Sequence, residues 1–189
     1  DAGVHARGQV AGFAMAWRHG ADRLAAALNA LLPADVAVVS AREAPDGFDA
    51  RRHARSRTYR YTFLRCAVRS PLRERTAWRV PPKIGVPAMR RACALFRGRH
   101  DFSAFTTRAA AARGAVRRVM KCTLSRRGDL LVLSVTGEAF LHHMVRFMAG
   151  SLAAVGLGRA REEDVRRALA GTGAVPAPPA PARGLALES

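Results

Sequence analysis

The sequence has only three cysteines, no long hydrophobic segment and almost no lysine. Cys66, Cys93 and Cys122 lie far apart and form no C-x-x-C pair, so the sequence predicts neither a zinc knuckle nor a disulfide framework. We expect three buried, reduced thiols, as is typical of a cytoplasmic protein. Arginines interrupt every apolar stretch before it reaches the roughly 18 residues that a membrane-spanning helix needs, so no membrane association is expected.

A surplus of positive charge is the strongest feature of the composition. Lys and Arg total 32 against 14 Asp and Glu, which gives a formal net charge of +18, and only Lys83 and Lys121 are lysines. A surplus of this size is typical of proteins that bind a polyanion, most often a nucleic acid. A genome that replaces lysine by arginine is the alternative, but it explains the ratio of the two residues and not the surplus. The charge therefore favours a nucleic-acid partner.

The apolar periodicity predicts an α+β fold with antiparallel sheets. Strands are expected at residues 8–17, 36–39, 58–64, 116–125, 130–137 and 184–187, and helices at residues 22–32, 89–96, 141–155 and from 162 onward. Four prolines between residues 71 and 87 predict a connection between an N-terminal part, residues 1–70, and a C-terminal part, residues 88–189. A second proline-rich run, residues 176–181, is expected to be a stiff linker.

Two adjacent histidines, His142 and His143, raise the question of a metal site. Both fall within the expected helix, where neighbouring side chains point about 100° apart and do not chelate one ion together. No third ligand stands at a suitable spacing. The sequence therefore predicts no metal.

Several ordered blocks of the chain resemble one enzyme family, the TruA-type tRNA pseudouridine synthases. The first block, residues 1–10, reads D-A-G-V-H-A-R-G-Q-V and is similar to the signature loop of that family. The other blocks follow in the family's order at residues 28–36, 48–51, 57–61, 98–105, 140–146 and 180–185. The resemblance covers nearly the whole chain.

This resemblance implies a cofactor-free isomerase that converts uridine to pseudouridine in the anticodon stem-loop of tRNA, at tRNA positions 38–40. It also implies two α+β subdomains of the RRM (ferredoxin-like) type on either side of a basic cleft, a homodimer, and a cytoplasmic location. The alternative from another functional class is a basic RNA-binding protein that keeps the fold without catalysing the reaction.

The resemblance assigns roles to four residues. Asp1 matches the catalytic aspartate, acting as nucleophile or base, although an Asp-Ala-Gly sequence by itself is typical of a turn. Arg146 matches the arginine that pairs with this aspartate and keeps it charged and oriented. Tyr59 matches the tyrosine that stacks on the target base, but strand periodicity places Tyr61 on the same face and does not separate the two. Leu185 matches the leucine on the other side of the base, where an ordinary core leucine is nearly as good an interpretation.

Arginines gather around Tyr59 in the sequence. Arg51, Arg55, Arg57 and Arg60 flank it, and basic residues interleaved with an aromatic residue fit a groove that binds RNA phosphates. A second basic cluster, which is either another RNA contact or a solvated face, comprises Arg108, Arg113, Arg117 and Arg118.

The chain also departs from the family pattern at both ends. The family carries Gly-Arg-Thr directly before the catalytic aspartate, with a strand and a helix further upstream, and it continues the last strand beyond Leu187. We therefore expect an N-terminally truncated fragment, and residues 1–189 alone are expected to be weakly active or inactive compared with the complete enzyme.

Overall fold

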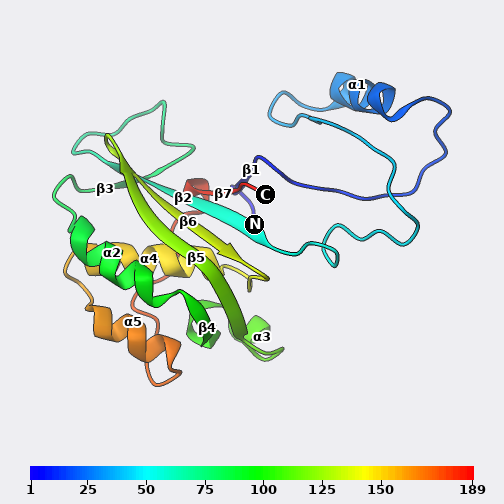
Figure 1. The fold of residues 1–189 in the computed structure, drawn as a ribbon. Helices are drawn as coiled ribbons and strands as arrows, with labels where there is room; N and C mark the ends of the chain where they lie inside the picture. Colours follow the sequence, from blue (N-terminus) through cyan, green and yellow to red (C-terminus); the bar gives the residue numbers. More distant parts are fainter. The chain divides into compact units, whose positions relative to one another are not determined.

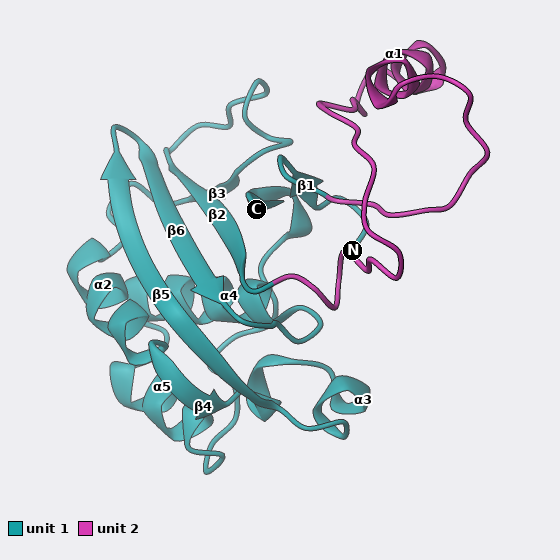
Figure 2. Cartoon of the chain, turned by 45° about the vertical axis from the view of Figure 1, so that its right-hand side comes forward, with its two compact units in different colours: residues 1–9, 55–189 teal, residues 10–54 magenta.

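The computed structural model describes residues 1–189, which form two compact units (Figure 1, Figure 2). Unit 1 comprises residues 1–9 and 55–189, and unit 2 comprises residues 10–54. These limits differ from the division expected at residues 71–87. The strand Arg57–Arg65 (β2) forms hydrogen bonds with strands from the C-terminal half of the chain, so residues 55–70 belong to the same unit as residues 88–189.

Unit 1 contains one mixed sheet. Besides β2, its strands are β1 (His5–Ala6), β3 (Trp78–Val80), β4 (Gly98–Asp101), β5 (Val116–Arg127), β6 (Leu130–Gly137) and β7 (Leu185–Leu187). The strand order is β1-β7-β2-β6-β5-β4, and β3 pairs with β2 beside this path. Most neighbours are antiparallel, as expected, but β1 pairs with β7 and β2 with β3 in parallel. The sheet thereby joins the two ends of the sequence.

Helices cover one face of this sheet. The helices α2 (Val86–Leu95), α4 (Met144–Gly156) and α5 (Glu162–Leu169) lie together on that side (Figure 1). Along β6, every second residue is fully buried and the residues between are half-buried, which is the pattern of an antiparallel strand with one covered face. The core between the sheet and the helices includes fully buried large side chains, among them Phe63, Phe96, Phe102, Leu131, Met148 and Leu152.

Three short elements complete unit 1. They are the helix α3 (Arg108–Ala111) and the two single 3₁₀ turns η1 (Ser103–Phe105) and η2 (Ala182–Gly184). No helix of the protein combines the length and the hydrophobicity that a membrane span requires.

Unit 2 contains one helix, α1 (Ala21–Leu31), which lies where the leucine spacing predicts it. The strands expected at residues 8–17 and 36–39 are wrong. Unit 2 offers no strand with which these segments pair, so their backbone groups have no ladder to join. A side chain replaces the ladder at one point: the Asn29 amide donates to the carbonyl of Val38 at 2.9 Å and accepts from its N–H at 2.7 Å.

The other predicted elements are confirmed with small changes of their bounds. The β5–β6 hairpin turns at Gly128, which takes the left-handed conformation with φ 58°. The long helix begins at Met144 instead of residue 141, for a reason that lies in the site described below.

The cysteines are reduced, but only two are buried. Cys93 of α2 and Cys122 of β5 face each other with their Sγ atoms 3.2 Å apart. The hydrogen bond from the Cys122 thiol lowers the pKa of Cys93, and the same bond together with burial raises the pKa of Cys122. Cys66 is half-buried, which corrects the expectation of three buried thiols.

Candidate active site

Asp1 lies in a turn that leads into the sheet. The N–H of Val4 donates to the Asp1 carbonyl at 3.3 Å, and Gly3 takes a left-handed φ of 80°. The chain then enters β1, where His5 is the register partner of Ala186 on β7. Asp-Ala-Gly is therefore a turn, as its sequence alone suggests, and the residue that begins this turn also carries the carboxyl group of the candidate site.

Three nitrogen atoms from one short segment surround the Asp1 carboxylate. Arg146 Nη1 and His143 Nε2 each lie 3.0 Å from Oδ2, and His142 Nε2 lies 3.0 Å from Oδ1. The side chains of Asp1 and Arg146 are only 17% and 15% exposed, so their ion pair is shielded from water much more than a surface pair. These contacts hold the carboxylate in place beside a permanent positive charge.

Arg146 is fixed by its own set of contacts. It belongs to the first turn of α4, and its Nε donates to the carbonyl of Ala180 at 2.8 Å. In return, the N–H of Ala180 donates to the Arg146 carbonyl at 2.9 Å. The proline-rich run at residues 176–181 is therefore more than the linker that the sequence predicts, because it orients the guanidinium that meets Asp1.

The two histidines do not have the helical geometry on which the prediction of no metal was based. They precede α4 instead of lying in it, and His143 is the only non-glycine residue with a positive φ, 62°. This left-handed residue turns both rings to the same side, where they stack with centroids 3.7 Å apart and planes inclined by 27°. It also explains why α4 begins at Met144. The prediction that the two side chains diverge is wrong.

The same arrangement defines the residues that could hold a metal. One ligand atom each from Asp1, His142 and His143 lies within 4.8 Å of the others. Arg146, however, already occupies Oδ2 of Asp1, and its positive charge opposes a dication at this position. Burial, together with the neighbouring His142 and Arg146, lowers the pKa of His143, although the carboxylate of Asp1 lies 3.0 Å away. The donor set therefore suits hydrogen bonding to the carboxylate better than metal coordination.

The structure separates the two tyrosines that periodicity leaves equivalent. Tyr61 is fully buried, and burial raises its pKa well above the usual range of tyrosine, against the opposing charges of Arg146 and Arg183. Tyr59 is partly buried and packs edge-on against Phe140, with ring centroids 5.0 Å apart. Tyr61 is thus a core residue, whereas Tyr59 has an aromatic neighbour and remains partly exposed to solvent.

Leu185 occupies the buried side of β7 opposite Tyr61. The residue before it, Gly184, lies so close to the Tyr61 ring that a Cβ atom there would come within 2.6 Å of Cζ. The position of Leu185 is therefore set by close packing on β2.

The arginines expected around Tyr59 have partners within their own units. Arg60 forms an ion pair with Glu188 (Nη2–Oε2 3.3 Å), and Arg57 Nη1 donates to the carbonyl of Glu138 at 3.4 Å. Arg51 belongs to unit 2, where its N–H donates to the Asp49 carboxylate at 2.8 Å.

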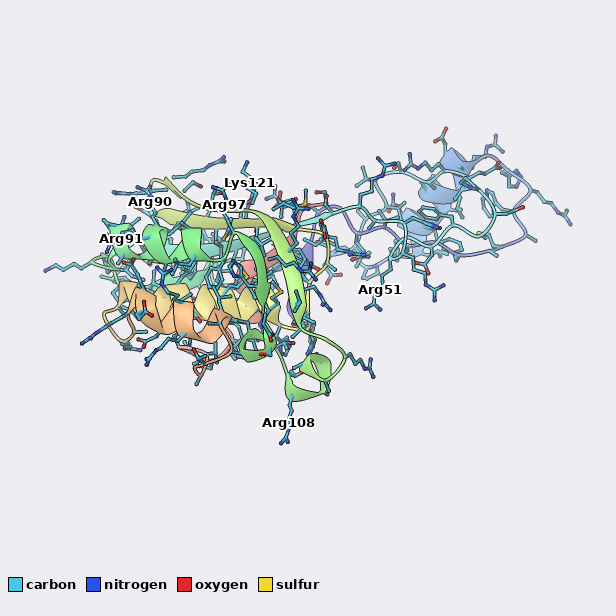
Figure 3. All side chains as sticks on the ribbon, turned by 60° about the horizontal axis from the view of Figure 1, so that its bottom comes forward. Arg51, Arg90, Arg91, Arg97, Arg108 and Lys121 are labelled. Atoms are coloured by element: carbon cyan, nitrogen blue, oxygen red, sulfur yellow. The ribbon has the colours of Figure 1, made fainter.

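Further basic side chains lie on the surface of α2 and the strands beside it. Figure 3 shows Arg90, Arg91 and Arg97 on and just after α2, with Lys121 on β5. Part of this charge is neutralised, since Arg91 pairs with Glu162 at 2.7 Å.

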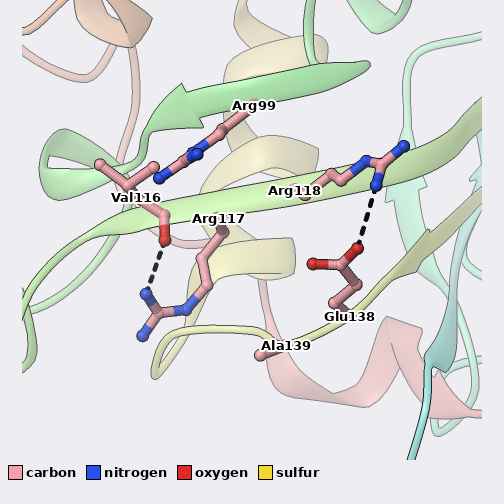
Figure 4. A pocket seen from close by; sticks show the side chains of 6 residues that line it. All are labelled: Arg99, Val116, Arg117, Arg118, Glu138 and Ala139. Atoms are coloured by element: carbon pink, nitrogen blue, oxygen red, sulfur yellow. Dashed lines mark hydrogen bonds and ion pairs between the residues drawn. The ribbon is translucent and has the colours of Figure 1, made fainter.

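The second basic cluster of the sequence is split between α3, the loop after it and β5. Arg117 and Arg118 line a hollow of about 430 Å³ together with Arg99, Val116, Glu138 and Ala139 (Figure 4). Glu138 pairs with Arg118 at 3.3 Å, and Arg117 donates to the carbonyl of Val116 at 2.8 Å. Arg99 forms no ion pair within the protein.

Sequence reasoning missed two parts of the site. It did not foresee the contacts of His142 and His143 with Asp1. These contacts depend on the positive φ angle of His143, which no sequence pattern indicates. It also missed Phe140 as the neighbour of Tyr59, although both lie in blocks that carry the family resemblance.

The fold and the site define a strongly basic α+β protein with a shielded, cation-paired carboxylate. Comparison with known proteins shows to which family within this class it is similar. The family model for tRNA pseudouridine synthases matches residues 92–189. The tRNA pseudouridine synthase A of Geobacter sp. (strain M21) is 47% identical over 179 aligned positions, and the match covers 91% of this chain and 70% of that protein.

Two further relatives carry the same name. The protein of Myxococcus xanthus is 45% identical over 190 residues, covering all of this chain and 72% of its own length. The protein of Geobacter sulfurreducens is 43% identical over 189 residues, again covering all of this chain and 78% of its own length. The chain therefore belongs to the tRNA pseudouridine synthase family.

Proposed function

We propose that this protein isomerises uridine to pseudouridine in tRNA and that Asp1 is its catalytic residue. The observation that carries the assignment of Asp1 is its ion pair with Arg146 at 3.0 Å, between side chains that are each at least four-fifths shielded from water. The relatives named tRNA pseudouridine synthase A, at 43–47% identity over most of this chain, support the reaction.

The reaction needs a carboxylate and no cofactor. The bond between N1 and the sugar breaks, the base turns, and C5 bonds to the sugar carbon while a proton leaves C5 and N1 gains one. The product is an isomer of the substrate, so no oxidant or group donor takes part. A carboxylate serves either as a nucleophile that holds the sugar or base, or as a base that removes a proton. Arg146 keeps Asp1 ionised for both roles.

Tyr59 and Leu185 are proposed to hold the target base. A uridine must leave its helical stack before a protein side chain reaches its glycosidic bond. Tyr59 offers a ring supported by Phe140, and stacking of a base on an aromatic ring contributes about 1–3 kcal/mol. Leu185 would supply the opposing apolar contact. Phosphates of the RNA are proposed to contact Arg51, Arg57 and Arg60. For this contact, Arg60 would have to leave its ion pair with Glu188.

The finer features of the family remain proposals for this chain. They are the preference for the anticodon stem-loop, two RRM-like subdomains beside a basic cleft, a homodimer, and a cytoplasmic location. The net charge of +18 supports tRNA as a partner. Mass measurement of the purified protein in solution tests the dimer, and mapping of pseudouridine in modified tRNA tests the site preference.

Replacing Asp1 tests the catalytic assignment. We expect Asp1→Asn to release tritium from tRNA labelled at C5 of uridine at least about a thousandfold more slowly than the wild type, because the shape is kept and the charge is lost. Its tRNA affinity should change little, and a filter-binding titration provides this control. An active Asp1→Asn protein would contradict the assignment. A wild type that binds tRNA but forms no pseudouridine would favour the non-catalytic alternative.

A further inference from the structure

The segment before α4 presents two imidazoles to one carboxylate, and its backbone is held in place to do so. Met144 N–H donates to the carbonyl of Leu141 at 3.1 Å, and Phe147 N–H donates to the carbonyl of His143 at 3.0 Å. The buried hydroxyl of Thr106 donates to the carbonyl of His142 at 2.8 Å. A left-handed conformation at a residue other than glycine costs free energy, and such residues persist where the surroundings fix them.

We propose that His142 and His143 are positioning residues that fix the plane of the Asp1 carboxylate for catalysis. Each imidazole holds a different oxygen, His142 at Oδ1 and His143 at Oδ2, both through Nε2 at 3.0 Å. Contacts with opposite oxygens limit the rotation of the carboxylate about the bond that carries it. This inference rests on the proposed catalytic role of Asp1.

Arg146 and the two imidazoles have different roles because they differ in charge. Arg146 supplies the permanent positive charge, whereas a neutral imidazole orients an oxygen without adding a second full charge. A second cation would stabilise the carboxylate further and make it a poorer nucleophile or base. The partial burial of His143 and the neighbouring charge of Arg146 favour this neutral form.

The stacked rings make the pair act as one unit. Because the ring centroids are only 3.7 Å apart, movement of either imidazole is limited by the other. The side chain of His143 is 24% exposed and that of His142 is 52% exposed, so His143 is the inner member of the pair. We therefore expect the larger effect from substitution of His143.

Two variants of His143 separate positioning from folding. Asparagine tolerates the left-handed conformation of this residue but is too short to reach Asp1. Glutamine is long enough to place its amide N–H near the position of Nε2. We expect His143→Asn to lower the single-turnover rate of pseudouridine formation about 10- to 100-fold, with a change of less than about twofold in the Kd for tRNA. His143→Gln should restore most of the rate.

The same comparison applies to His142 with a smaller effect. We expect His142→Ala to lower the rate about 3- to 10-fold and His142→Gln to restore it. Equal rates for wild type, His143→Asn and His142→Ala would overturn the proposal. So would a loss of rate that follows a lowered melting temperature and is not restored by glutamine.

Nitrogen NMR of the purified protein at neutral pH gives a readout besides activity. We expect both imidazoles to carry their proton on Nε2, and a proton on Nδ1 of either neutral ring would overturn the proposal, because that ring could not donate to Asp1. Stoichiometric zinc in the purified protein would also overturn it, since the three side chains would then be ligands. An active Asp1→Asn variant removes the proposed function as a whole, whereas an inactive one beside unaffected histidine variants removes only this inference.

Discussion

The hydroxyl of Tyr61 donates a hydrogen bond of 2.8 Å to the carbonyl of Pro181. This contact joins the centre of the sheet to the segment that carries Ala180 on one side and Leu185 on the other. The Tyr61 side chain is fully buried, and the Pro181 carbonyl accepts a second, longer hydrogen bond of 3.4 Å from the Gly184 N–H. The contact therefore fixes both the chain that orients Arg146 and the strand that ends at Leu187.

Removal of this hydroxyl should destabilise the protein. We expect Tyr61→Phe to lower the free energy of unfolding by about 1–2 kcal/mol, because the Pro181 carbonyl would keep only the longer hydrogen bond from the Gly184 N–H, at 3.4 Å. Denaturant unfolding followed by circular dichroism measures the change. Tyr59→Phe is the matched control, since no hydrogen bond of the Tyr59 hydroxyl exists within the protein, and its effect should stay within about 0.5 kcal/mol. Equal effects of the two variants would contradict the role of the buried bond.

The same tyrosine should make stability fall at alkaline pH. Burial raises the pKa of Tyr61 in the folded protein, whereas an unfolded tyrosine ionises near pH 10. Above that pH the unfolded state releases a proton that the folded state keeps, so the free energy of unfolding falls as pH rises. One proton corresponds to about 1.4 kcal/mol per pH unit. The stability difference between wild type and Tyr61→Phe should therefore shrink above pH 10, and a constant difference would contradict this.

The tyrosines also show how far the sequence predicts the site. Periodicity correctly places Tyr59 and Tyr61 on one face of a strand, but it does not report which ring meets the core, because that depends on Pro181 and Gly184 more than a hundred residues away. The hairpin of β5 and β6 and the helices were predictable because their signals are local.

Features that depend on tertiary structure were not predictable in the same way. The orientation of His142 and His143 follows from the left-handed conformation of His143. This conformation puts both residues before α4, whereas the sequence suggests that they lie within the helix. The two strands expected in residues 8–17 and 36–39 have suitable residues but no partner strand in their unit. Strand formation depends on pairing, and a pattern within one segment does not show whether a partner is present.

Gly150 of α4 should be required both for stability and for activity. A Cβ atom at this position would overlap the carbonyl oxygen of Pro178, which is backbone and has little freedom to move. Alanine normally favours a helix over glycine by about 1 kcal/mol, but the overlap costs more, so we expect Gly150→Ala to destabilise the protein by about 1–2 kcal/mol. The displaced segment carries Ala180, so the rate of pseudouridine formation should fall about tenfold.

A substitution of the same kind at an open position serves as the control for Gly150. A Cβ atom on Gly12 would make only an ordinary contact of 3.5 Å with Phe48. Gly12→Ala should leave stability within about 0.5 kcal/mol of the wild type and the rate unchanged. If Gly150→Ala behaves like this control, the proline-rich segment does not hold Arg146 in the way that the contacts indicate.

Arg99 should contribute to tRNA affinity but not to chemistry. It lines the hollow beside β5 without an acidic partner, whereas Arg118 in the same hollow is paired with Glu138 (Figure 4). If an RNA phosphate binds in the hollow, Arg99→Gln removes one contact with a phosphate, and with it the release of about one counterion on binding. The slope of log Kd against log salt concentration should then fall by about 1. The single-turnover rate at saturating tRNA should not change. Arg166→Gln is the control, because Arg166 already pairs with Glu163 on α5, and its slope should equal that of the wild type. An unchanged slope for Arg99→Gln would identify the hollow as a solvated face, the alternative that the arginine cluster leaves open, and would confine RNA contacts to other parts of the surface.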